Sequence, residues 1–257
     1  MARVLSRFLF VVTFCWMMPS AQAASLTIAA AADLKFALAE VVENFRVQHP
    51  ADKVEVIYGS SGKFFTQIVN GAPFDLYFSA DIAYPQKLAS QGLTAGAAHP
   101  YAIGRIVLWG IGSEWAHLGL QDLPRSKVAK FAIANPQHAP YGLRAQQALQ
   151  HAGVWEAIQP RLVLGENVAQ SAQFVDSGAA DAGVVALSLV LSPAMQGKGN
   201  WTLIPADWHE PLEQGYVILA RARDNPLARG FAGYMASEPA RAVMRRYGFV
   251  LPDKGDK

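Results

Sequence analysis

Four short turns carry the residue types with which this chain could do chemistry. They are Ala32-Asp33, Ser60-Ser61, Tyr141-Gly142 and Asn167-Val168, and each opens a predicted helix. The first turn of a helix has N–H groups without partners and the positive end of the helix dipole. Several such turns facing one cleft would bind an anion without any lysine or arginine, and two serine hydroxyls would add donors. For each turn alone, the alternative is ordinary helix capping.

Catalytic patterns are lacking in the sequence. Gly59-Ser60-Ser61-Gly62 is not the Gly-x-Ser-x-Gly elbow of a hydrolase, and Lys63 lies outside any phosphate-binding loop pattern. The six histidines are scattered, with no His-x-x-Glu-His pattern, so we expect no dedicated zinc site. An exported hydrolase that uses Ser61 with a distant histidine is one alternative to an anion-binding protein. Loss of turnover in Ser61→Ala would support this alternative.

The elements that position these turns alternate between strand and helix. Alternating or buried apolar runs predict strands over residues 25–31, 53–58, 74–79, 101–110, 128–134, 161–164, 181–187 and 214–220. Helical spacing predicts helices over residues 33–48, 63–70, 81–91, 143–152, 168–177 and 226–247. Short connections between alternating elements favour α/β lobes, each with a mostly parallel sheet flanked by helices.

Two of the predicted strands, 101–110 and 214–220, join the two α/β series. We therefore expect a signal peptide over 1–23, the first part of lobe I over 24–103, lobe II over 104–214 and the second part of lobe I over 215–257. A chain that crosses twice between lobes is the architecture of a hinged binding protein.

The N-terminus has the pattern of an export signal. Arg3 and Arg7 precede the apolar run 8–18, and Ala21-Gln22-Ala23 has the small-x-small form of a cleavage site. The run is too short to span a bilayer, which disfavours the alternative of an uncleaved anchor. The pattern predicts a mature chain that starts at Ala24 and lies in the periplasm.

Composition narrows the class of function. The only cysteine, Cys15, lies in the leader, so we expect no disulfide in the mature chain. Without the two leader arginines the chain has 20 basic and 20 acidic residues. A net charge near zero disfavours a nucleic-acid partner, which would need a basic surface. We expect a monomer.

Segments along nearly the whole mature chain together carry a family resemblance. In order they are residues 29–34, 59–62, 67–75, 78–81, 101–104, 133–136, 139–142, 165–170 and 246–249. The sequence resembles the periplasmic molybdate-binding proteins of ABC importers. The resemblance implies the two-lobed type II periplasmic binding protein fold with two hinge strands, an oxyanion ligand such as molybdate or tungstate, and a membrane permease as partner. It implies no cofactor and no enzymatic activity.

The resemblance also implies which residues hold the oxyanion. Ser61 would give its hydroxyl and its N–H, and Tyr141 and Val168 would give N–H groups. Ala32 and Asp33 would supply the contacts of the first helix. Secondary candidates are Ser60, beside the ligand set, and Ala186, which stands where some members have a tyrosine that reaches the ligand. No protein atom would contact the metal directly.

Asp33 departs from the family, whose members often have Ser, Thr or Asn at the first turn. A carboxylate about 4 Å from one negative charge is repelled by about 4 kcal/mol at an effective dielectric of about 20. Asp33 then either caps its own helix or accepts a proton from a protonated oxyanion. The second alternative favours hydrogen phosphate or arsenate as the ligand, and sulfate is a further alternative to molybdate.

Overall fold

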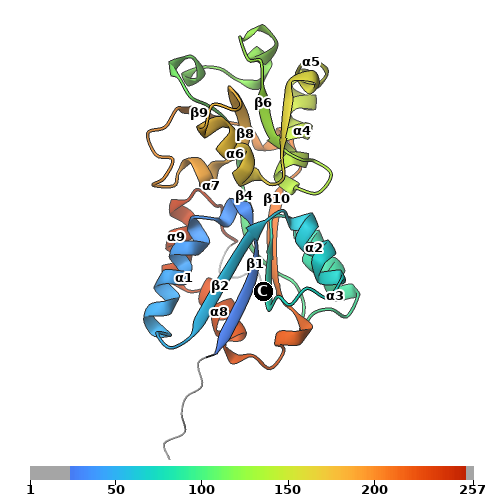
Figure 1. Cartoon of the computed structure of the whole chain (residues 1–257), viewed down its shortest axis with the longest axis vertical. Coiled ribbons are helices and arrows are strands. Elements are labelled where there is room, and N and C mark those ends of the chain that lie inside the picture. Colours follow the sequence, from blue (N-terminus) through green and yellow to red (C-terminus); the bar gives the residue numbers. More distant parts are fainter. Residues whose placement is uncertain (1–23, 253–257) are drawn as a thin grey trace, which may run out of the picture.

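The computed structural model describes residues 24–252, which form two lobes stacked along the long axis of the molecule (Figure 1). The predicted signal peptide lies outside the described residues. Within residues 24–252, no helix is long and apolar enough to cross a membrane.

Lobe I is built from both ends of the described chain. Its strands are β1 (Ser25–Ala31), β2 (Lys53–Gly59), β3 (Leu76–Ser79), β4 (His99–Gly104) and β10 (Leu212–Ile218). Its helices are α1 (Ala37–Gln48), α2 (Ser61–Val69), α3 (Ala83–Ser90), α8 (Pro226–Met235) and α9 (Glu238–Arg246), with short 3-10 turns η1 (Ala32–Leu34) and η6 (Ala220–Ala222). The sheet order is β2-β1-β3-β10-β4, with β1 parallel to β2 and β3, and β10 antiparallel to its neighbours.

Lobe II is formed by the middle of the chain. Its strands are β5 (Ile106–Gly110), β6 (Phe131–Ala134), β7 (Leu162–Gly165), β8 (Ala182–Ala186) and β9 (Asn200–Leu203). Its helices are α4 (Pro140–His151), α5 (Trp155–Ile158), α6 (Val168–Asp176) and α7 (Leu187–Val190), with 3-10 turns η2 (Ser113–Ala116), η3 (Leu120–Arg125), η4 (Gln159–Arg161) and η5 (Ala206–Trp208). The sheet order is β7-β6-β8-β5-β9, and β5 runs antiparallel to both of its neighbours.

The expected two-lobed α/β fold is confirmed, and each sheet is mixed, with four of its five strands pointing the same way and one strand, β10 or β5, running against them. Each has a parallel core of three strands, and β10 or β5 adds an antiparallel strand because the chain enters it from the other lobe. The predicted strand 101–110 is two strands that break at Arg105, where the chain crosses to lobe II. Gly104, expected in lobe II, pairs with Leu212 in the sheet of lobe I.

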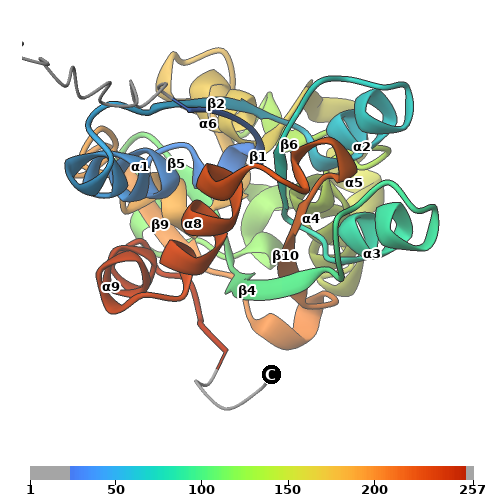
Figure 2. The same cartoon turned by 90° about the horizontal axis from the view of Figure 1, so that it is seen from below.

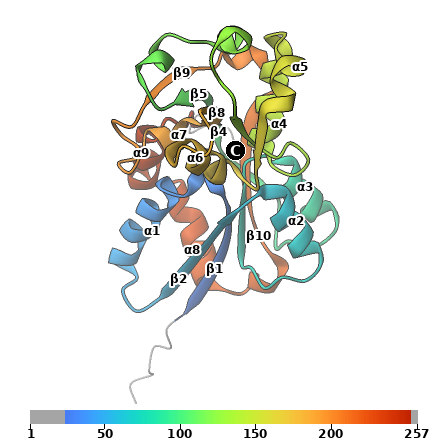
Figure 3. The same ribbon diagram turned by 45° about the horizontal axis from the view of Figure 1, so that its top comes forward.

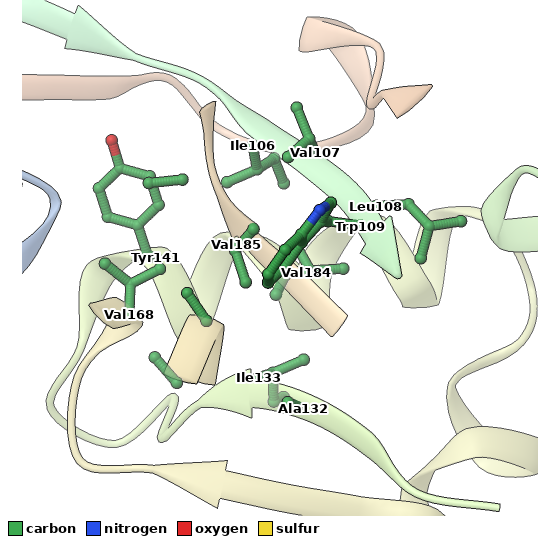
Figure 4. Close-up of a cluster of buried hydrophobic side chains, with 14 of the residues drawn as sticks. Ile106, Val107, Leu108, Trp109, Ala132, Ile133, Tyr141, Val168, Val184 and Val185 are labelled. Carbon is green, nitrogen blue, oxygen red and sulfur yellow. The ribbon is translucent and has the colours of Figure 1, made fainter. Parts of the chain in front are cut away.

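Three apolar clusters hold the lobes together. In lobe I, α1, α8 and α9 cover one face of the sheet and α2 and α3 the other (Figure 2). In lobe II, the fully buried Trp109 packs among valines and isoleucines of β5, β6 and β8 (Figure 4). This third cluster extends to Ala31, Ala32 and Ala80 of lobe I. Alanines at the carboxyl ends of β1 and β3 thus let the two lobes approach closely.

Candidate oxyanion-binding site

A small cavity of about 10 Å³ lies between the lobes, and each of the four predicted turns contributes at least one residue to its lining. The lining residues are Ala31, Ala32, Asp33, Gly59, Ser60, Ser61 and Ala80 from lobe I, and Ala139, Pro140, Tyr141, Asn167 and Val168 from lobe II. This volume is about that of one water-sized sphere. The lobes are therefore closed on each other, and an oxyanion enters only when they move apart.

Ser61 begins α2, and its hydroxyl is held in a fixed place. The N–H of Ala80 donates to Ser61 Oγ over 3.0 Å, and Tyr77 Oη donates to the Ser61 carbonyl over 2.7 Å. Because Ser61 Oγ acts as acceptor for Ala80, its own proton is free to point at an anion. The Ser61 N–H, in the first turn of α2, has no acceptor within the helix.

Tyr141 and Val168 present N–H groups from the other lobe. Pro140 and Tyr141 are the first two residues of α4, so the Tyr141 N–H precedes the helical hydrogen bonds. Asn167 caps α6 by accepting from the N–H groups of Ala169 and Gln170, each at 3.1 Å. This cap leaves the N–H of Val168, the first residue of α6, without a partner inside the helix.

The hydrogen-bond donors of the site carry partial positive charge without any cation. The N-termini of α2, α4 and α6 meet at the cavity from both lobes, and each helix of nine residues or more brings about half a positive charge. Figure 3 shows α6 beside the upper end of β1 at the junction. No Lys, Arg or His lines the cavity. Such N–H and O–H donors suit an anion rather than a metal cation, and within residues 24–252 no cluster of three or more His, Cys, Asp or Glu could hold a metal.

Asp33 is buried in a hydrogen-bond network that includes residues of both lobes. Two of its members lie on β4 and β10, the strands next to the two places where the chain crosses between the lobes. Its Oδ2 accepts from Tyr141 Oη over 3.1 Å and from Gln214 Nε2 over 2.8 Å, and Tyr101 Oη donates to Gln214 Oε1 over 2.5 Å. Its backbone carbonyl accepts from Ser188 Oγ over 2.7 Å. Asp33 is 1% exposed and Gln214 is fully buried.

The capping role expected for Asp33 is wrong. The residue that precedes η1 is Ala31, and no side chain caps this turn, because the Asp33 carboxylate is engaged by Tyr141 and Gln214 instead. Burial raises the pKa of Asp33 to about 6, although hydrogen bonds from Gln214 and Tyr141, and the N–H groups of Asp33 and Leu34, lower it. Oδ1 is buried and has no hydrogen-bond partner.

Ser60 bridges the lobes rather than facing an anion with a free proton. Its Oγ donates to the His138 carbonyl over 2.6 Å and lies 3.0 Å from His138 Nδ1. His138 Nε2 is 4.0 Å from Glu166 Oε2, which is beyond hydrogen-bond reach. The series Ser60, His138 and Glu166 has the residue types of a hydrolytic triad, but the serine proton goes to a carbonyl, so the base does not activate it.

Ala186 is not part of the cavity wall. It ends β8, pairs with Ile106 and is fully buried in the core of lobe II. In the same core, Tyr141 and Val168 lie at one edge of the cluster (Figure 4). The residues that sequence reasoning missed are Gln214 and Tyr101, which are buried polar residues in β10 and β4.

Two lobes that close over a buried set of hydrogen-bond donors define a solute-binding protein. The family model of bacterial extracellular solute-binding proteins matches residues 26–250. The molybdate-binding protein of Azotobacter vinelandii is 36% identical over 233 residues, which cover 90% of this chain and 92% of that protein. The molybdate-binding protein of Rhodobacter capsulatus is 33% identical over 199 residues, 77% of each chain. The solved periplasmic molybdate-binding protein of A. vinelandii has a TM-score of 0.81 at 35% identity, covering 88% of this chain and 99% of that one.

The chain therefore belongs to the bacterial extracellular solute-binding protein family. The resemblance to periplasmic molybdate-binding proteins that the sequence motifs predicted is confirmed. These matches are to solute-binding proteins and not to enzymes, which agrees with the prediction that the chain binds rather than converts its ligand.

Proposed function

We propose that this chain captures molybdate or tungstate in the periplasm and delivers it to the membrane permease of an ABC importer. The observation that supports the proposal most strongly is the meeting of three helix N-termini and the Ser61 hydroxyl in one interlobe cavity that has no lysine or arginine. Neutral donors compensate a dehydrated dianion without forming ion pairs, so the ion is held firmly and can still be released when the lobes open.

In this mechanism Ser61 donates from its hydroxyl and N–H in lobe I, and Tyr141 and Val168 donate N–H groups from lobe II. The ion thus favours the closed state, because only there do both sets of donors reach it. The leader residues 1–23 direct export and are removed before Ala24. The closed monomer presents a surface made of both lobes to the permease, and no cofactor takes part.

A thermal-shift and calorimetric comparison of molybdate, tungstate, sulfate and phosphate tests the proposal. For a ligand at 100 times its Kd, we expect a stabilisation of about 2.7 kcal/mol. For a chain of this size, this raises the Tm by about 5–10 °C. Molybdate and tungstate should give the shift and sulfate should not. Binding of none of the four ions would refute the proposal.

A second candidate ligand is a protonated oxyanion such as hydrogen phosphate or arsenate. The buried Asp33 Oδ1 favours it, because an ion that carries a proton would give this oxygen a hydrogen bond. In the same screen, a shift with phosphate and none with molybdate would select this alternative.

A further inference from the structure

Asp33, a residue that lines the cavity, has one buried carboxyl oxygen without a hydrogen bond. Tyr141 Oη and Gln214 Nε2 both donate to Asp33 Oδ2, whereas Oδ1 has no partner and is shielded from water. A buried acceptor without a donor is costly, and a buried carboxylate beside an anion more so. The residue lies in the same wall as Ser61 and Val168, so any anion held by those donors lies near Asp33.

We propose that the site binds its oxyanion together with one proton, which Asp33 Oδ1 holds against an oxygen of the ion. This inference rests on the proposed function. The proton comes from the solvent: an O–H bond forms on Oδ1, the carboxyl becomes neutral, and its O–H donates to the oxyanion, whose charge is unchanged. Asp33 is then a hydrogen-bond donor of the site instead of a repelling charge.

The geometry selects Oδ1 as the protonated oxygen. Oδ2 already accepts two hydrogen bonds, and a proton on it would displace one of them. A proton on Oδ1 displaces nothing. It also converts an oxygen without a donor into a donor, and an anion is the acceptor that this donor needs.

The groups that face the carboxyl offer it no other means of neutralisation. Tyr141 of α4 and Tyr101 of β4 are the titratable neighbours, and burial, ahead of the charge of Asp33, raises the pKa of both well above 10. Gln214 of β10 and Ser188 of α7 do not titrate.

Charged groups near the mouth of the site have other partners or lie outside the cavity. Lys63 of α2 pairs with Glu166, which precedes α6. Lys35 lines a neighbouring pocket, which shares Ala32 and Asn167 with the cavity, but Lys35 itself does not line the cavity. Of the influences on the pKa of Asp33, none is a cation. A proton is therefore the available positive charge.

Closure of the lobes supplies the driving force for proton uptake. In the closed state burial raises the pKa of Asp33 from 3.8 to about 6, and a dianion in the cavity raises it further. When the lobes separate, water reaches the carboxyl and the pKa returns toward its ordinary value. The proton is therefore taken up as the ion is enclosed and lost as the ion is released.

Calorimetry with molybdate tests this coupling directly. Titrations at about pH 7.5 in buffers of different ionisation enthalpy should report an uptake close to one proton per ion. The Kd should rise about tenfold per pH unit between about pH 7 and 8.5, where molybdate itself stays fully deprotonated. Asp33→Asn, which keeps the shape and offers an N–H donor, should take up no proton and show a flat Kd. Glu43→Gln, an exposed carboxylate on α1, should behave as the wild type.

Tyr141→Phe provides a second arm if Asp33→Asn does not fold. Loss of the Tyr141 hydrogen bond removes an influence that lowers the pKa of Asp33, so the pH at which binding weakens should move upward. A wild-type protein that binds molybdate with a flat Kd and no proton uptake would overturn this inference alone. A protein that binds no oxyanion at any pH would overturn the proposed function instead.

Discussion

Gly62→Ala should block closure of the lobes while leaving each lobe folded. Gly62 is the second residue of α2, it does not have a positive φ, and its N–H donates to the His138 carbonyl of lobe II over 2.9 Å. A Cβ at this position would lie 2.6 Å from the same carbonyl oxygen and 2.9 Å from Tyr84 Oη. The tyrosine hydroxyl can move away, but the backbone of the facing lobe cannot unless the lobes separate.

The size of the loss in affinity depends on whether the open or the closed state contains the clash between the added Cβ and the His138 carbonyl oxygen. Alanine is a better helix former than glycine by up to about 1 kcal/mol, so lobe I alone is not weakened. Forcing a methyl group into closed packing costs about 1–3 kcal/mol, and this cost falls on the closed state only. Because the ion is bound in the closed state, we expect the Kd to rise by a factor of about 5 to 150.

Isothermal titration with molybdate measures the loss, and small-angle scattering measures the contraction on binding, which the variant should show less fully. Gly233→Ala is the matched control, since Gly233 lies in α8 and an added Cβ there meets no atom within 4 Å. It should bind as the wild type does. Equal affinity in Gly62→Ala and the wild type would refute the view that the ion is held between closed lobes.

Three further predictions concern the site residues. Ser61→Ala removes a hydrogen bond to a charged ligand worth about 1.5–3 kcal/mol, so calorimetry should find a Kd about 10 to 150 times higher; an unchanged Kd would exclude the hydroxyl as a ligand. Asn167→Ala removes the cap of α6 and should lower the unfolding free energy by about 1 kcal/mol in urea melts, whereas no loss would show that the cap is not needed. Asp33→Asn should flatten the pH dependence of stability: the folded pKa of Asp33 is raised from 3.8 to about 6, so its stabilising contribution is present below pH 3.8 and lost as the pH rises through 6. From pH 4 to 7 the wild type should therefore lose roughly 2–3 kcal/mol relative to the variant in urea melts, and parallel curves would contradict the raised pKa.

The helix starts at the site were predictable from sequence because their signals are local. The turns at residues 60–61, 141–142 and 167–168 predicted a helix start near each of these places, and the structure brings all three starts to one cavity. Helix α6 begins at Val168 as predicted, whereas α2 begins at Ser61 rather than residue 63 and α4 at Pro140 rather than residue 143. The role of Ser61, Tyr141 and Val168 as ligands stays a prediction. The broad fold followed from the same alternation of strands and helices.

What the sequence could not provide is long-range pairing. Asp33 lies at a helix start, where local rules favour a cap, but its partners are 108 and 181 residues away along the chain. They meet it only because the chain crosses twice between the lobes, which brings β4 and β10 side by side. The mixed sheets have the same origin, since a strand that returns from the other lobe enters the sheet antiparallel. Local periodicity in the sequence predicts neither the distant partners of Asp33 nor the direction in which a returning strand enters the sheet.

The placement of the Asp33 network indicates which contacts control closure. At the rim, Lys63 pairs with Glu166, and both side chains are about half exposed. Because water and salt weaken an exposed ion pair, this pair contributes little to the stability of the closed state. The inner contacts are dry: Tyr141 belongs to lobe II, Asp33 to lobe I, and Tyr101 and Gln214 to the strands next to the crossings. Separation of the lobes must break the bond between Tyr141 and Asp33. Gly104 makes that bond possible, because a Cβ there would lie 2.3 Å from Tyr141 Oη. We therefore expect the charge state of this carboxyl to influence the balance between open and closed lobes more than the exposed Lys63–Glu166 pair does, alongside the interlobe pair of the buried Arg144 with Asp81.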